Sequence, residues 1–457
     1  MNNSSKKLGP KTVFTQCPDQ KGYLNNWRRW QWEANSVNNQ SKGSAKKSSQ
    51  SNDQPYHFEF ILMSYNILAQ DLLEGHAQLY TEHDPRALPW NQRYGRLMAE
   101  INTIQPDILC VQELQQNHVD HFRKGLSYNY GMLYKKRTGG EKTDGCAVLY
   151  RQDLLDLITH HEVEYFQPNV NKLNRENVAI IAKFALKNNP LVKLVVSTTH
   201  LLYNPRRQDI RLAQIQVLLA ELDRLAFCGT LPNGTPQYDP VILCGDFNLQ
   251  PFTAPYELLT KGFLRYDRLA SRTLHRADSN GHVEQTGKLF LPPALGITDN
   301  CQHDNLRVRE GAQTSTFDMT RLYHSIHSAT KSNRKDSESE SCTAESSANY
   351  RRQFSSGSLG HRFAFESAYT HHMSEQNRRA TTYQDDWITV DYLFYTPYRS
   401  VAECSRHLPN WNLDLLGTYM LPTVQMCGFE IESIPNMLYG SDHFSLAGRF
   451  VLSIPKN

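Results

Sequence analysis

The sequence lacks the marks of membrane-spanning, disulfide-rich and zinc-ribbon proteins. Its nine cysteines are scattered and none lies in a CxxC pair, so neither a zinc ribbon nor a disulfide framework is indicated. The longest apolar runs are far too short to cross a bilayer, and no apolar segment follows residues 1–7. We therefore expect no membrane span, no membrane partner and no secretory signal. Reduced thiols in the cytoplasm, or in the cytoplasm and nucleus, are the expected setting.

Charge of one sign is also scarce, since the net charge is only +3 over 457 residues. This small net charge neither indicates nor excludes nucleic-acid binding. The chain is 39% hydrophobic and 21% charged, which is typical of a soluble globular protein. Its length allows up to about three average domains, or one large domain with insertions.

Two segments have too few apolar residues to offset the entropy of ordering. Residues 1–54 are predicted to form a largely disordered N-terminal segment, and the Ser-rich residues 331–360 a disordered insertion in a surface loop. The N-terminal segment contains a Trp/Arg motif at residues 27–32. Its rings could stack on RNA bases, but docking on the folded domain is the preferred interpretation. The rest, residues 55–457, is predicted to be one domain.

The most informative stretch is the apolar run 241–244, which predicts a buried strand and is followed by Gly245, Asp246 and Asn248. If the strand continues, Asp246 and Asn248 point to the same side. A carboxylate can take a proton from water, and a neutral amide can hold a phosphate without repelling it. The simpler alternative is an ordinary polar turn.

Other predicted strands also end in polar residues. Strands near 57–63, 108–112 and 194–199 are followed by Asn66, Glu113 and His200, and helices are expected at 90–104 and from about 208. A lone polar residue at a strand end is usually a turn or solvated residue, so the repetition carries the prediction. Asn177, at the start of another strand, and Arg206 with Arg207, at a helix start beside His200, are candidate substrate contacts.

Near the C-terminus, Asp391 lies inside an apolar strand and therefore needs a partner. The segment around Asp442 and His443 can supply one. An Asp391–His443 pair would fix the imidazole tautomer and favour its protonated form, which can stabilise negative charge on a phosphate during attack. The alternative is that Asp442 and His443 cap a hairpin.

These motifs, taken in order, resemble the endonuclease/exonuclease/phosphatase superfamily, which has the DNase I-like fold. Within it the chain is most similar to the deadenylase-like branch, and there to the Angel proteins, through residues 63–73 and 199–207. The resemblance runs from residue 56 to the C-terminus. The matching stretches are 64–66 (SYN), 112–113 (QE), 199–201 (THL), 245–248 (GDFN), 390–392 (VDY) and 441–443 (SDH).

The resemblance implies an α/β fold: a four-layer sandwich of two mixed β-sheets flanked by helices, with the site at one edge. It implies that Glu113, Asn66 and Asp442 bind Mg²⁺, with Mn²⁺ as the alternative, and that Asp246 activates water. Asn248 and His200 would hold the phosphate, and His443, held by Asp391, would stabilise the transition state. The implied substrate contacts are Asn66, Arg206, Arg207 and Asn177.

The resemblance leaves the reaction open between two enzymes of RNA 3′ ends. One is a 3′–5′ exoribonuclease of deadenylase type, and the other removes a 2′,3′-cyclic phosphate. A phosphatase of another phosphoester and a non-catalytic protein that binds RNA or a translation factor are the further alternatives, although the complete catalytic set argues against the last. RNA 3′ ends and translation or mRNA-decay factors are the expected partners, and a monomer is the expected state.

Overall fold

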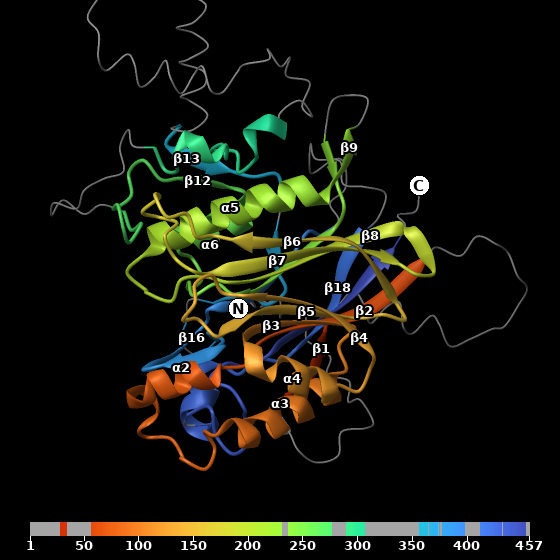
Figure 1. The fold of residues 1–457 in the computed structure, drawn as a ribbon, viewed down its shortest axis with the longest axis vertical. Coiled ribbons are helices and arrows are strands. Elements are labelled where there is room, and N and C mark those ends of the chain that lie inside the picture. The colour runs from red at the N-terminus through yellow and green to blue at the C-terminus, as the bar shows by residue number, and fades with distance from the viewer. Residues whose placement is uncertain are drawn as a thin grey trace, which may run out of the picture.

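The structure is a computed structural model, and it describes residues 28–33, 56–230, 236–276, 289–306, 356–363, 365–372, 374, 377–397, 412–431 and 433–453. Two mixed β-sheets lie face to face at its centre (Figure 1). The first has seven strands in the order β1 (Trp30–Trp32), β18 (Asn412–Tyr419), β19 (Leu446–Ser453), β2 (His57–Asn66), β3 (Ile108–Gln115), β5 (Asp144–Arg151) and β4 (Tyr130–Lys136). The second has six, in the order β14 (Glu366–Ser367), β17 (Asp391–Tyr395), β11 (Val241–Asp246), β8 (Asn189–His200), β7 (Val178–Leu186) and β6 (Leu155–Glu164).

Helices cover the outer face of each sheet (Figure 1). The first sheet carries α2 (Gln70–Gly75), α3 (Trp90–Ile104) and α4 (Val119–Lys124), and the second carries α5 (Gln208–Ala226) and α6 (Ala254–Lys261). The remaining helical turns are η1 (Ala77–Tyr80), η2 (Gln116–His118), η3 (Pro293–Leu295), α9 (Val424–Met426) and η5 (Cys427–Ile431). Three two-stranded sheets complete the described elements: β9 (Phe227–Thr230) with β10 (Pro236–Tyr238), β12 (Phe263–Arg265) with β13 (Ser358–Gly360), and β15 (Thr382–Gln384) with β16 (Asp386–Ile388).

Three apolar cores hold the layers together. Successive side chains of a strand point to opposite faces, so Leu62 of β2 packs between the sheets, while Met63 and Tyr65 pack under α3. The third core lies between the second sheet and α5 with α6. Strands buried on both faces explain why the sequence shows continuous apolar runs instead of alternation. The predicted four-layer α/β sandwich is confirmed.

The strand pairing brings the polar strand ends to one edge. Strands β2 and β3 are parallel, as are β8 and β11, so their carboxyl ends coincide in pairs. His200 lies opposite Asp246 in the register, and Asp246 lies opposite Asp391 of the antiparallel β17. His200 and Asp391, which are 191 positions apart in the sequence, are thus both brought beside Asp246.

Two predicted disordered segments contain ordered residues. Strand β1 of the Trp/Arg motif pairs antiparallel with β18, so residues 28–33 dock on the domain, as preferred over RNA stacking, and do not belong to a disordered segment. Strand β13 falls within the predicted insertion 331–360, of which residues 331–355 lie outside the described residues. The division of the chain near residue 54 stays a prediction. Among the described residues, no helix is long and apolar enough to cross a membrane.

Candidate active site

A pocket of about 300 Å³ opens at the edge where the strand ends meet. Its floor includes Glu113, His200, Asp246 and His443. All four are buried, with at most 8% of the residue exposed. Buried ionisable groups in a pocket require partners, so their contacts reveal what the site is built to hold.

Asn66 joins two of the acidic groups. Its Nδ2 donates to Glu113 Oε1 at 2.9 Å and to Asp246 Oδ2 at 3.0 Å. Its Oδ1 accepts the backbone N–H of Leu68 at 3.1 Å. Because the amide oxygen already has this backbone donor, Asn66 acts in this structure as a bridge between carboxylates. The predicted metal-ligand role of Asn66 stays a prediction.

The backbone is bent where it presents the two carboxylates. Glu113 lies in an irregularity of the β3–β5 pairing and has a φ of 59°, a conformation that non-glycine residues adopt at a cost. Gly245 has a φ of 132°, and a Cβ there would lie 2.0 Å from the Thr199 carbonyl oxygen. Only glycine therefore allows β11 to lie this close to β8 beside Asp246.

Burial and mutual repulsion weaken the acidity of both carboxyl groups. Burial, with Asp391 and Glu113 nearby, raises the pKa of Asp246 to about 8, although His443 and Asn66 act in the opposite direction. Burial and Asp442 raise the pKa of Glu113. Carboxylates held together at this cost indicate a site that binds positive charge.

His443 and Asp391 form the predicted pair. His443 Nδ1 lies 2.8 Å from Asp391 Oδ2, and both residues are buried. Burial alone would lower the pKa of His443, but Asp391, Asp442 and Asp246 raise it well above the usual value. The imidazole is therefore held protonated, with Nε2 facing Asp246 Oδ2 at 3.8 Å and Asp442 Oδ1 at 3.9 Å.

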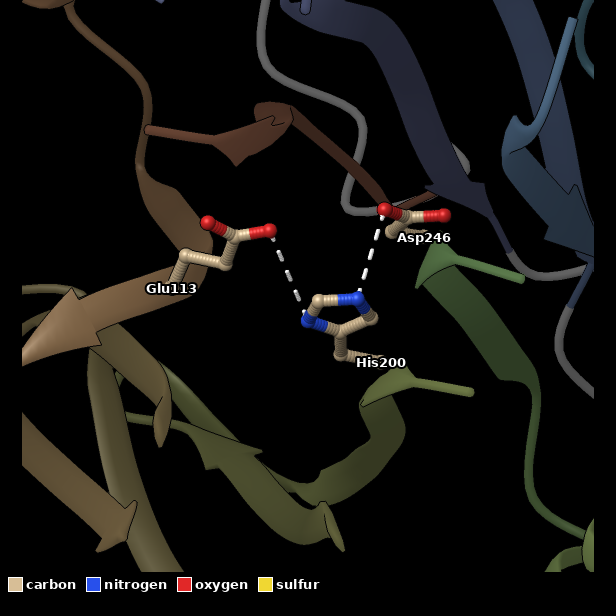
Figure 2. A group of neighbouring side chains, drawn as sticks. All are labelled: Glu113, His200 and Asp246. Carbon is tan, nitrogen blue, oxygen red and sulfur yellow. Dashed lines mark ion pairs between the residues drawn. The ribbon is translucent and has the colours of Figure 1, made fainter. Parts of the chain in front are cut away.

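His200 lies between Glu113 and Asp246 (Figure 2). Its Nε2 is 3.5 Å from Asp246 Oδ2, and its Nδ1 is 4.0 Å from Glu113 Oε1. Burial, together with the charge of Arg137, lowers the pKa of His200 to about 3, so this imidazole is neutral at physiological pH. Within the described residues its Nδ1 has no hydrogen-bond partner.

This donor set fits a metal ion. One ligand atom from each of Glu113, His200 and Asp246 lies within 4.8 Å of the others, and Asp246, Asp391 and His443 form a second such group. The second group contains the protonated imidazole, which cannot donate a lone pair while both nitrogens carry protons. The first group, with two carboxylates and a neutral imidazole lacking a partner at Nδ1, is the better metal site.

The other polar candidates line the pocket but are already engaged. The amide of Asn248 donates to the Leu201 carbonyl at 3.1 Å. Strand β11 ends at Asp246 and Asn248 has a φ of 52°, so the strand does not continue to Asn248, although Asn248 still lines the pocket. Asn177 donates to the His200 carbonyl at 3.0 Å and accepts from Gln214, which fixes the end of β8. Asp442 accepts from Tyr80 at 2.9 Å.

The structure does not bring Arg206 and Arg207 to the pocket lining. Arg206 is exposed, and Arg207 forms a two-pronged pair with Asp209 at 2.9 and 3.0 Å. An arginine and a lysine also line the pocket, Arg137 and Lys142, from the loop between β4 and β5. The basic residues 135–137 are the sequence signal that could have found Arg137, but a basic cluster alone more often marks a solvated loop. Lys142 and the lining residues Tyr80, Tyr203 and Tyr383 carried no comparable signal.

The fold and this site together define a class of protein. A model of the endonuclease/exonuclease/phosphatase family matches residues 63–443, and the chain belongs to that family. Among its relatives, angel homolog 2 of Danio rerio is 33% identical over 413 residues, covering 87% of this chain and 65% of its own. Angel homolog 1 of Homo sapiens is 33% identical over 439 residues, covering 87% and 63%. The chain thus spans just under two thirds of the length of these relatives.

A solved structure is also similar. The crystal structure of ANGEL2, a 2′,3′-cyclic phosphatase, in complex with adenosine-2′,3′-vanadate aligns with a TM-score of 0.65 and 29% identity. The alignment covers 88% of this chain and 99% of that one. The family match, from residue 63 through His443, spans the residues that line the pocket.

Proposed function

We propose that this protein is a metal-dependent phosphoester hydrolase that removes 2′,3′-cyclic phosphate from RNA 3′ ends. One observation carries the proposal: the side chains of Glu113, Asp246, His200 and His443 converge in one pocket. The choice of the 2′,3′-cyclic phosphate as the group that is hydrolysed rests on the similarity to ANGEL2, a 2′,3′-cyclic phosphatase. Complete removal consumes two waters and breaks two P–O bonds, which leaves both ribose hydroxyls free and releases inorganic phosphate.

Glu113 would hold the metal, and His200 is close enough to join it. Mg²⁺ is the proposed ion and Mn²⁺ the alternative, since hard cations prefer carboxylate oxygens. When bound, the ion supplies positive charge to a phosphate oxygen and to the leaving oxygen. Asn66 keeps the two carboxylates at a fixed separation through its two hydrogen bonds.

Asp246 is the proposed base. Its Oδ1 accepts the Asn248 N–H at 2.9 Å, which fixes the carboxylate, and its Oδ2 faces the pocket histidines. A carboxylate whose pKa burial has raised can take a proton from water near neutral pH. Nε2 of His443 carries the proton that stabilises charge on the phosphate, and Asp391 holds the ring by Nδ1.

The walls of the pocket suit a nucleotide. Arg137 and Lys142 give a cationic wall for phosphate oxygens. Leu72, Leu79 and Tyr80, from α2 and η1, give an apolar wall for a nucleoside. A monomeric state and association with translation or mRNA-decay factors stay predictions.

The test uses purified full-length protein and two labelled RNAs, one ending in a 2′,3′-cyclic phosphate and one in an adenosine tract with a free 3′-OH. We expect Mg²⁺-dependent loss of the cyclic phosphate without shortening, abolished by EDTA. Progressive shortening of the second RNA would instead assign a deadenylase-type exonuclease. No metal-dependent change in either RNA would refute action on RNA 3′ ends.

A further inference from the structure

We propose that Arg28, from the N-terminal Trp/Arg motif, is a positioning residue of the active site. The inference rests on the proposed function for its kinetic test, but its structural basis is separate. Arg28 does not line the pocket. It is 1% exposed, and buried polar contacts connect it to the end of β2, which carries Asn66, and to the segment before β19, which carries His443.

Arg28 is bound on every side. Its Nη1 pairs with Glu100 Oε1 of α3 at 2.5 Å, its Nη2 donates to the Ser445 carbonyl at 2.6 Å, and its Nε donates to the Met420 carbonyl at 3.3 Å. The guanidinium also lies 4.5 Å from the centre of the Tyr419 ring. The planar fork thus joins three segments at once, which a lysine ammonium cannot do with the same geometry.

Glu100 connects Arg28 to the two segments that carry Asn66 and His443. It is 2% exposed, and it accepts from Tyr65 at 3.0 Å and from the Ser445 hydroxyl at 2.6 Å. Tyr65 immediately precedes Asn66 in β2, and Ser445 follows His443 by two residues. The network therefore fixes the backbone on both sides of the pocket floor from behind.

A direct contact ties the same two segments together in front. The Ser441 hydroxyl donates to the Asn66 carbonyl at 2.6 Å. A displacement of Glu100 would therefore move Asn66 and His443 relative to Glu113 and Asp246, which lie on other strands. Small errors of this kind reduce the rate of a reaction that depends on fixed geometry more than they reduce substrate binding.

The alternative is that Arg28 only stabilises the fold, as any buried ion pair would. Arg151 offers a control that is less buried, because its side chain is 21% exposed and that of Arg28 is 0% exposed. It pairs with Asp107 at 3.1 Å and with the exposed Asp153, and Asp107 immediately precedes β3 at the end opposite Glu113. Arg151→Met therefore removes an arginine ion pair of the same domain without touching the network behind the pocket.

The experiment compares Arg28→Met, Arg28→Lys and Arg151→Met in the full-length protein. We expect Arg28→Met to lower kcat at least tenfold with KM within threefold of the parent, and Arg28→Lys to lie between. Arg151→Met should lower the melting temperature with kcat unchanged. If Arg28→Met does not fold, the double variant Arg28→Met/Glu100→Gln removes both charges, so no unpaired charge stays buried, and it should show the same loss of kcat.

A measurement without substrate separates this inference from the proposed reaction. In ¹⁵N-histidine-labelled protein, the Nδ1 proton of His443, hydrogen-bonded to Asp391, should give a distinct downfield signal. It should shift or broaden in a folded Arg28 variant and stay in place in Arg151→Met. An unchanged signal, or a kcat within twofold of the parent in any folded Arg28→Met variant, would overturn the inference. An inactive parent with the expected NMR result would refute only the proposed reaction.

Discussion

Replacing Asp391 by asparagine tests whether the imidazolium of His443 takes part in the reaction. The substitution keeps the shape of the side chain and removes a negative charge 2.8 Å from His443 Nδ1. At an effective dielectric constant of about 20, two unit charges at that separation attract by about 6 kcal/mol. Asp442 and Asp246 lie within 4 Å of His443 Nε2 and retain part of this attraction. We therefore expect a net loss of about 3 to 4 kcal/mol, a fall in kcat of about 100- to 1000-fold.

The pH dependence has a definite sign. In the parent, the raised pKa of His443 keeps the ring protonated through neutral pH, despite the opposing effect of burial. Without the Asp391 charge that pKa falls, so the protonated form is lost as pH rises through the neutral range. The ratio of parent to variant kcat should therefore grow from pH 6 to pH 8.

The assay is phosphate release from RNA with a 2′,3′-cyclic phosphate at saturating Mg²⁺, with the melting temperature measured in parallel. Asp107→Asn is the matched control. Asp107 accepts the Ile61 N–H at 2.8 Å and pairs with Arg151, away from the pocket. It should change stability and leave kcat as it was. A kcat within threefold of the parent in folded Asp391→Asn, with a ratio independent of pH, would refute the role given to His443.

Three further changes test other parts of the site. Asn66→Asp places a third carboxylate between those of Glu113 and Asp246, so we expect kcat to fall about 10- to 100-fold. Mg²⁺ should relieve the added repulsion and therefore raise the melting temperature of the variant more than that of the parent. An equal rise in both proteins would contradict this expectation. Arg137→Ala and Lys142→Ala should each raise KM about tenfold, which corresponds to a loss of about 1.4 kcal/mol of binding free energy, and keep kcat within threefold of the parent. An unchanged KM in steady-state assays would exclude the two residues as phosphate contacts. Gly245→Ala should lower the free energy of unfolding, measured by urea titration, by about 3 kcal/mol or more, because the alanine Cβ would lie 2.0 Å from the Thr199 carbonyl oxygen. Stability equal to that of the parent would show that β8 and β11 can move apart at little cost.

Much of the site could be predicted because it lies at strand ends. A buried strand has a clear apolar pattern, and the polar residue that ends it is then conspicuous, as with Glu113, His200 and Asp246. The requirement that a buried carboxylate have a partner made His443 a candidate partner of Asp391, and their hydrogen bond is present.

The errors arise where the backbone leaves regular geometry or where partners are distant in sequence. Asn248 adopts a positive φ that strand periodicity cannot reveal. Arg207 pairs with Asp209, two residues away, and lies outside the pocket lining, whereas Arg137, which pairs with Asp144 at 3.5 Å, reaches the pocket through the path of a loop. Arg28 is buried by contacts with residues up to 417 positions away, and no local pattern encodes such an arrangement.

The account depends most on Asp246 as the base, and Asp246→Asn tests it most directly. Burial beside Asp391 and Glu113 raises the pKa of this carboxyl to about 8, so a neutral amide of the same size should relieve repulsion and leave the melting temperature at or above that of the parent. We predict that phosphate release from 2′,3′-cyclic-phosphate RNA falls at least about 1000-fold, while the variant still binds that RNA as the parent does. Parent-level release by the folded variant would contradict the mechanism.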